Sequence, residues 1–349
     1  MKVKRLLKHD NTPILLVFLG MLVVVVLIEW IFVRGGDFGR VAFLRPMNVS
    51  NVLLQVAVTG ILAIGMTLVM ISGGIDLSVG QMVSFLGTLT AFLLRTGTWN
   101  AYSVALFIIV LGVLCQLFMG FIISRTTLEP FIISLGFMSI YRGLTYLISG
   151  GRELSIHGQF TFLGQSRINI TPQLRLGMPV IIFLLLIISV GLILKYTKFG
   201  RRVYAVGNNE NAAFLAGINV RDFKLLIYAI NGLLIAIASM TLASRLGTGN
   251  PLMGQGREIE VIAAVVVGGT ALSGGKGNIY GTLIGAMLLG IISNALNILG
   301  VSPHWQFVMR GVVIIIAVVI GYLSSIGTFS LKTLFKSRRA IEPDPVNPA

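Results

Sequence analysis

Long apolar segments follow one another along almost the whole chain, and they restrict its fold more than any other feature. Only 11% of the 349 residues are charged, whereas soluble domains carry roughly 25%. A helix needs about 20 mostly apolar residues to cross a bilayer. We therefore predict an all-α polytopic membrane protein with about ten transmembrane helices. The segments lie near residues 13–33, 52–71, 79–94, 104–123, 130–148, 179–194, 224–243, 259–272, 279–299 and 307–323.

Two of the ten segments, 79–94 and 259–272, are short for a bilayer and are flanked by glycine. Short, glycine-flanked segments are typical of broken helices that line a transport pathway. A boundary misplaced by a few residues explains the same pattern. The first segment, 13–33, follows a basic N-terminus, but it is too long for a signal peptide and no small-residue cleavage site follows it. We interpret it as an uncleaved first span.

The distribution of Lys and Arg predicts the orientation. If the N-terminus is inside, 16 of the 27 basic residues lie in inner segments, nine lie in outer segments, and Arg142 and Arg310 fall within spans. Cytoplasmic loops carry an excess of Lys and Arg, so both termini are predicted to be cytoplasmic. The basic residues behind the net charge of +15 therefore orient the protein in the membrane. They do not indicate a nucleic-acid partner, which is excluded. Residues 1–12 form a cytoplasmic N-terminus, 13–323 the transmembrane domain and 324–349 a cytoplasmic tail.

Two glycine-rich stretches resemble each other at a separation of 201 residues. Each contains Ser-Gly-Gly and lies between two spans at their inner ends. Backbone that leaves a helix inside a membrane needs a cavity or a protein partner, and paired breaks in two halves of a transporter indicate a pathway or gate. We predict a local internal repeat, with the Asp76 carboxylate capping the helix after the first break. The predicted gate comprises Ser72, Gly73, Gly74, Asp76, Ser273, Gly274 and Gly275.

The inner segment 195–223 is long enough to contain structure of its own. From Asn208 to Leu215 it has a helix start signal and alanine-rich composition, and Gly217 is a stop signal. The pattern predicts a short helix that projects into the cytoplasm, with Phe214 and Leu215 available to a partner. A solvated basic loop is the alternative.

Enzyme and metal-site motifs were sought in the sequence. Lys276 lies in Gly-Gly-Lys-Gly, but the first glycine and the magnesium-binding Ser or Thr of a phosphate-binding loop are missing. His9, His157 and His304 are scattered and no acidic cluster accompanies them. The single Cys115 allows no intramolecular disulfide. We therefore expect no catalysis, no metal site and no cofactor bound by this chain.

Charged residues are rare within the spans. Glu29 lies near the outer end of the first span, which suits an interfacial residue better than the midplane carboxylate of an ion-coupled carrier. We therefore expect a partner protein to supply the energy for transport. The alternative is that the chain is a secondary carrier driven by an ion gradient. Neutral polar side chains within the spans can bind the hydroxyl groups of a polyol, although each can instead join two helices by a hydrogen bond. Arg142 can face a cavity or extend its side chain to the membrane surface. The candidate pathway comprises Gln55, Thr59, Thr88, Tyr141, Arg142, Asn231 and Asn294.

One stretch identifies a family. Residues 62–80, LAIGMTLVMISGGIDLSVG, closely resemble the signature of the permease subunits of bacterial monosaccharide ABC importers of the ribose, xylose, arabinose and galactoside type. Residues 130–144, 200–218 and 267–277 also resemble family segments. The resemblance runs from about Asn51 to Leu323.

This resemblance implies a permease subunit that forms the pathway for a monosaccharide across the inner membrane, driven by ATP hydrolysis in another subunit. The implied partners are a cytoplasmic ABC ATPase, which uses ATP and magnesium, a periplasmic sugar-binding protein and a second permease copy in a homodimer or heterodimer. Residues 195–223 resemble the ATPase-docking loop, with Asn211 where an acidic residue is common. The implied docking residues are Asn208, Asn211, Ala212, Ala213, Phe214, Leu215 and Gly217.

Overall fold

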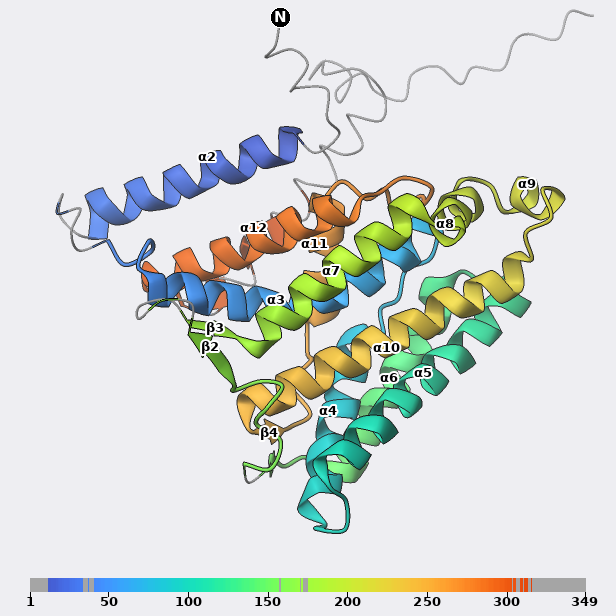
Figure 1. Ribbon diagram of the computed structural model, residues 1–349, viewed down its shortest axis with the longest axis horizontal. Coiled ribbons are helices and arrows are strands. Elements are labelled where there is room, and N and C mark those ends of the chain that lie inside the picture. The colour runs from blue at the N-terminus through green and yellow to red at the C-terminus, as the bar shows by residue number, and fades with distance from the viewer. Residues whose placement is uncertain are drawn as a thin grey trace, which may run out of the picture.

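The computed structural model describes residues 12–33, 37, 41–156, 158–169, 171 and 175–302, together with seven residues between 304 and 315. Helices form most of this part (Figure 1). Most of the tenth predicted span and of the two predicted cytoplasmic termini lies outside the described residues. The elements are α2 (Thr12–Ile28), the π-helical η1 (Glu29–Val33), α3 (Pro46–Ile71), α4 (Val79–Arg95), α5 (Ala101–Arg125), α6 (Pro130–Ser149), β1 (Leu154–Ser155), β2 (Arg167–Asn169), β3 (Arg175–Gly177), α7 (Met178–Tyr196), α8 (Lys198–Asn208), α9 (Glu210–Leu215), α10 (Val220–Leu246), β4 (Thr248–Gly249), α11 (Arg257–Val267) and α12 (Ile279–Ile298).

The other nine predicted segments are helical, which confirms an all-α polytopic membrane protein. Six helices, α3, α5, α6, α7, α10 and α12, are long and apolar enough to cross a membrane. The short segment 259–272 is a helix of 11 residues followed by a turn. At 1.5 Å per residue α11 is roughly 16 Å long, about half of the ~30 Å hydrocarbon layer. The segment is therefore a half-length helix and not a misplaced boundary.

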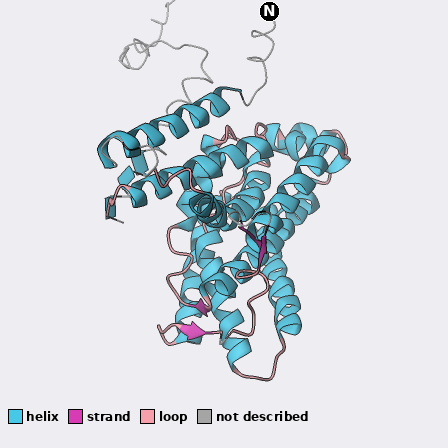
Figure 2. Ribbon diagram, turned by 60° about the vertical axis from the view of Figure 1, so that its left-hand side comes forward, coloured by secondary structure: helices cyan, strands magenta, loops and turns pink. Residues whose placement is uncertain are grey.

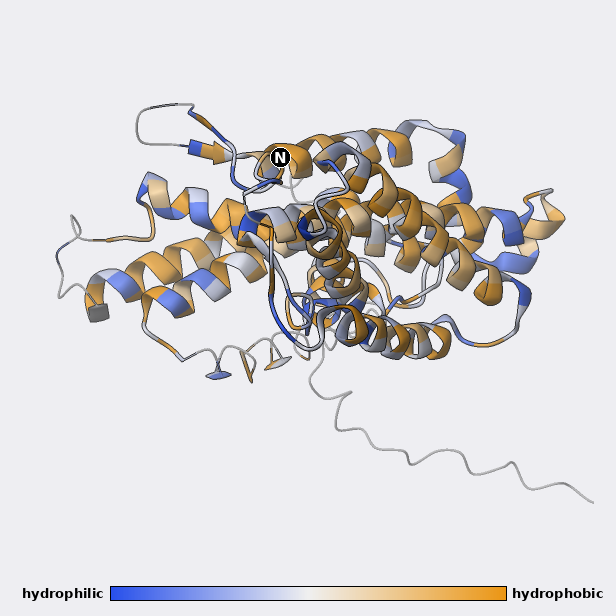
Figure 3. Cartoon of the chain, turned by 90° about the horizontal axis from the view of Figure 1, so that it is seen from below, coloured by the Kyte–Doolittle hydropathy of each residue, from blue (hydrophilic) through white to orange (hydrophobic). Residues whose placement is uncertain are grey.

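Helix α3 lies at the centre of the molecule. From Val56 to Ile71 every one of its residues is buried, around the whole circumference of the helix. Helices α7, α10, α11 and α12 pack against it, and α4, α5 and α6 form a second group around α10. Exposed hydrophobic residues are numerous on α5, α6 and α7, and most of the helical cartoon has the hydrophobic colour in Figure 3. A helix that is apolar on all sides suits the protein core, and an apolar outer face suits lipid.

The structure has two short antiparallel strand pairs within the described residues (Figure 2). They lie on the side of the molecule opposite α9 (Figure 1). Strand β1 pairs with β4, and β2 pairs with β3. The segment between β1 and β2 is joined to the end of α10: the Gly164 amide donates to Ser244 Oγ at 2.8 Å, and Gln165 Nε2 donates to the Ser244 carbonyl at 3.0 Å. These bonds hold the long connection between α6 and α7 over the ends of α10 and α4.

Glycine brings α5 and α10 into close contact. A methyl group added at Gly232 would overlap the Gly112 carbonyl oxygen, and one added at Gly120 would lie 2.8 Å from the Cβ atom of Tyr228. Small residues at a helix crossing let two backbones approach and gain van der Waals contact, which is a main source of helix association in membranes. Helices α5 and α10 therefore form a tightly packed pair.

Glu29, predicted to be an interfacial residue, is buried inside the protein, while its depth in the membrane stays a prediction. Its side chain is only 1% exposed. Its two carboxylate oxygens accept hydrogen bonds from the backbone amides of Ala42 at 2.7 Å and Phe43 at 2.9 Å. Residues 42 and 43, shortly before α3, thus direct backbone amides at the carboxylate. A buried charge needs such donors.

We expect Gly232→Ala to destabilise the protein, because α5 and α10 must separate to make room for the methyl group. Overpacking costs roughly 1–3 kcal/mol, which thermal unfolding of the detergent-solubilised protein would detect as a lower melting temperature. Gly136→Ala is the matched control, since no atom lies within 4 Å of a methyl group added at that exposed helical position. Equal melting temperatures for the two variants would contradict the tight contact.

Candidate functional site

The predicted docking segment contains two helices, α8 and α9, instead of the single helix predicted (Figure 1). Sequence reasoning missed α8. Thr197 caps it, with Oγ1 accepting from the Gly200 amide at 3.4 Å, and Val203 and Val206 are buried beneath it. Its other side is basic and exposed, with Arg201 and Arg202. It lies along the surface at the end of α7.

The N-cap of α9 lies one residue after Asn208, the predicted start signal. Asn208 is the last residue of α8, and Asn209 has the extended conformation of an N-cap, with Oδ1 accepting from the Ala212 amide at 2.9 Å. The predicted stop is confirmed, because Gly217 has φ +82° and ends the turn after α9. A left-handed residue at a helix end favours glycine.

Most of the predicted docking residues are exposed. Phe214 is 68% exposed and Leu215 is 84% exposed, whereas Ala213 is buried. Asn211 and Ala212 are exposed beside them. Two large apolar side chains are therefore exposed at the tip of a polar segment. Such exposure is typical of a surface that meets another protein.

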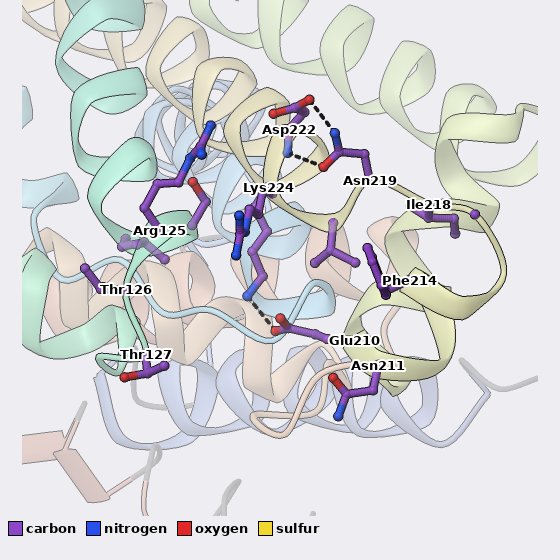
Figure 4. Close-up of a pocket in the computed structure, with 15 residues that line it drawn as sticks. Arg125, Thr126, Thr127, Glu210, Asn211, Phe214, Ile218, Asn219, Asp222 and Lys224 are labelled. Atoms are coloured by element: carbon purple, nitrogen blue, oxygen red, sulfur yellow. Dashed lines mark hydrogen bonds and ion pairs between the residues drawn. The ribbon is translucent and has the colours of Figure 1, made fainter.

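A groove of about 1020 Å³ separates α9 from the end of α5 (Figure 4). Arg125, Thr126 and Thr127 line one side, and Glu210, Asn211 and Phe214 line the other. Lys224, in the first turns of α10, forms an ion pair with Glu210 at 2.5 Å. Asn219 caps α10, with Oδ1 accepting from the Asp222 amide at 3.4 Å. The groove therefore combines an aromatic side chain with charges of both signs.

The two predicted helix breaks meet directly beneath α8. The amide of Gly275 donates to the Ile71 carbonyl at 2.8 Å, which joins the second break to the end of α3. A methyl group added at Gly207, near the end of α8, would overlap the same carbonyl oxygen. Tyr204 Oη also donates to the Gly277 carbonyl at 3.0 Å. We call this contact of 71–74, 204–208 and 274–277 the glycine junction.

The geometry of the glycine junction depends on glycine. Gly73 has φ +88° and Gly274 has φ +81°, a conformation that other residues rarely adopt. A Cβ atom at Gly274 would lie 2.9 Å from Gly73 Cα. The sequence repeat thus corresponds to two turns in contact, while their action as a gate stays a prediction.

Asp76 follows the first break and is completely buried. Its Oδ1 accepts from the amide of Ser78 at 2.9 Å and from its hydroxyl at 2.6 Å. Its Oδ2 accepts from Gln116 Nε2 on α5 at 2.7 Å and from Asn231 Nδ2 on α10 at 2.9 Å. The one backbone amide that Asp76 binds belongs to Ser78, the residue before α4, so it does not cap the first amides of α4 as predicted. This bond is one of four.

The structure does not bring the predicted pathway residues together. Asn231 bonds to Asp76, and Asn294 exchanges two hydrogen bonds of 2.9 Å with Asn48. Thr59 accepts from Arg257 at 3.5 Å. These three join helices, as the alternative interpretation expected. Thr88 is buried and Gln55 is half-buried, each on a different helix.

Tyr141 and Arg142 lie on different faces of α6. Tyr141 is 2% exposed and stacks on Phe85 of α4, with ring centroids 5.8 Å apart, and it contacts Phe137. Arg142 is exposed. The two side chains therefore do not share one cavity wall within this chain. A role for either residue in the pathway stays a prediction.

Sequence reasoning missed Gln116 and Tyr204. Gln116 is a single amide in the apolar run of α5, and that isolation is a signal that could have identified it, because a buried polar side chain in a span needs a partner. Tyr204 carries no comparable signal, since its partner is a backbone carbonyl 73 residues away.

Comparison with known proteins agrees with this arrangement. The family described as "Branched-chain amino acid transport system / permease component" matches residues 48–318, more than half of the chain. The chain belongs to this permease family. The predicted permease component is thereby confirmed. No solved structure matches the chain.

Three curated relatives cover most of this permease. It is 39% identical over 307 residues to the ribose import permease protein of Bacillus subtilis (strain 168), which covers 87% of this chain and 91% of the relative. It is 37% identical over 283 residues to the ribose import permease protein of Escherichia coli (strain K12), covering 80% and 86%. The xylose transport system permease protein of the same strain is 34% identical over 337 residues, covering 79% and 85%.

We expect Gly207→Ala to loosen the glycine junction, because the methyl group displaces the Ile71 carbonyl and breaks its bond to Gly275. Trypsin should then cut faster after Arg201 and Arg202. Trypsin cuts the locally unfolded form, so its rate is proportional to the population of that form when opening and closing are fast. A loss of about 1.4 kcal/mol in local stability raises this population, and the cleavage rate, about tenfold. Fragment masses would assign the cuts. Gly143→Ala, with no atom within 4 Å of the added methyl group, should leave the rate unchanged; an unchanged rate in Gly207→Ala as well would refute the contact.

Proposed function

We propose that this permease is the membrane subunit of a bacterial ABC importer for a monosaccharide, with ribose as the first candidate cargo. Two of the relatives are named for ribose import and one for xylose transport, at 34% to 39% identity and with at least 85% of each relative covered. The printed family description names branched-chain amino acids. The named sugar permeases match nearly their whole length, and that coverage favours a sugar.

Helix α9 and the groove beside it are the docking surface for a partner ATPase. The observation that carries this proposal is the exposure of Phe214 and Leu215 at the tip of α9. Truncating apolar and aromatic anchors of this kind is what costs binding energy at protein interfaces. The ion pair between Lys224 and Glu210 holds α9 against the start of α10. A force on α9 is therefore passed to α10 and, through α8, to the glycine junction.

Transport follows an alternating-access scheme. ATP binding closes the two ATPase subunits and displaces α9. The glycine junction lies at the inner ends of α3 and α4 and before α12, so its displacement changes the angles between these helices. Buried interfaces switch between discrete arrangements instead of deforming smoothly. The pathway then opens toward one side of the membrane at a time.

The remaining partners follow the same assignment. Both termini are cytoplasmic, in line with the excess of Lys and Arg in the inner segments, and the membrane is the bacterial inner membrane. The connection between α6 and α7, held to α10 by Ser244, is then on the periplasmic side, where a sugar-binding protein delivers its cargo. A second permease copy completes the transporter.

We expect the double variant Phe214→Asp, Leu215→Asp to insert into the membrane normally and to lose its ATPase partner. Two charges would replace the apolar contact, so copurification of the ATPase and ATP-dependent ribose uptake should both fall at least about tenfold, as for loss of a binding hot spot of 2 kcal/mol or more.

The matched control is Phe162→Asp, which changes an aromatic residue that is 64% exposed at the opposite end of the molecule. This variant should keep the ATPase bound. Normal ATPase binding by the double variant would remove the docking role of α9.

A further inference from the structure

Asp76 holds three separate elements together. Its carboxylate belongs to the segment 72–78 between α3 and α4, and its Oδ2 binds Gln116 on α5 and Asn231 on α10. The same carboxylate fixes Ser78, the residue before α4. The bonds to Ser78 are local, so the bonds to two further helices need another explanation.

The two helices that hold Asp76 also carry the groove beside α9. Gln116 is nine residues before Arg125, and Asn231 is seven residues after Lys224, so they lie about 14 Å and about 10 Å from the groove along their helices. The close contact at Gly112 and Gly232 makes α5 and α10 a tightly packed pair. Displacement at the groove therefore moves Gln116 and Asn231 together.

A carboxylate suits this position better than an amide. Each oxygen of Asp76 accepts two hydrogen bonds, and Gln116 and Asn231 both present NH₂ groups to Oδ2. An amide side chain has one accepting oxygen and would point its own NH₂ group at these donors. Burying a charge within a membrane protein is costly, and such residues usually serve function.

We propose that Asp76 is a positioning residue, which transmits displacement of the α5–α10 pair to segment 72–78 and so sets the tilt of α4 against α3. The displacement comes from the ATPase that docks beside α9, so this inference rests on the proposed function. Loss of the Oδ2 bonds leaves both helices folded but lets the break move independently of the pair.

Asp76→Asn tests the proposal because it keeps the shape of the side chain but places an NH₂ group opposite the NH₂ groups of Gln116 and Asn231. The hydrogen bonds to these two residues are then lost. Gln116→Glu in the same chain supplies an acceptor for that NH₂ group, and the double variant should recover. Thr90→Val is the control, since its buried hydroxyl donates to the Leu86 carbonyl of its own helix. All variants are studied in the complex with the ATPase.

The first readout needs no cargo. Spin labels at Met47 and Thr98, both exposed, report the distance between the outer ends of α3 and α4, in a chain that carries Cys115→Ala. Distances measured without nucleotide and with ATP and vanadate should differ in the unsubstituted complex and in Thr90→Val. They should coincide in Asp76→Asn and differ again in the double variant.

The second readout is ribose uptake per ATP hydrolysed in proteoliposomes. It should fall about tenfold in Asp76→Asn, a size typical of coupling between sites, and recover in the double variant. The positioning role is overturned if folded Asp76→Asn shows the ATP-dependent distance change, or if the unsubstituted complex shows none. If the distances respond as expected and the unsubstituted complex takes up no ribose, the proposed cargo is wrong and the positioning role stands.

Discussion

The contact on which the rest of the structure depends is the hydrogen bond from the Gly275 amide to the Ile71 carbonyl. Ile71 ends the central helix α3, and the chain must leave that helix among buried residues. Backbone groups freed from a helix in apolar surroundings need partners. Here the second glycine-rich turn supplies one, and α8 approaches so closely that Gly207 has no room for a side chain.

Two structural routes lead from the α9 end of the molecule to the break after α3. One passes through α8 to the glycine junction, by way of Tyr204 and Gly207. The other passes along the packed pair of α5 and α10 to Asp76. Both routes end within segment 71–78, which belongs to the stretch 62–80 that resembles the permease signature. A break held from two sides can be moved as a unit with the helices that hold it.

Much of the fold could be predicted because apolar segments are a local property. Nine helices match the predicted segments to within six residues, and the two turns of the repeat were found from Ser-Gly-Gly alone. Helix α8 was missed because it is only 11 residues long and its apolar residues Phe199, Val203 and Val206 are separated by basic, polar and small ones. The two helical partners of Asp76 lie 40 and 155 residues away, and Glu29 accepts from backbone amides. Packing determines these partners, and no local pattern shows them.

We propose that ATP hydrolysis in a partner powers this permease. The most direct measurement is uptake of radiolabelled ribose into proteoliposomes that contain the permease, its ATPase and its binding protein. Uptake should require ATP and the binding protein, and should continue after ionophores collapse all ion gradients. Uptake that persists without ATP and stops when the gradients collapse would contradict the claim and identify an ion-coupled carrier.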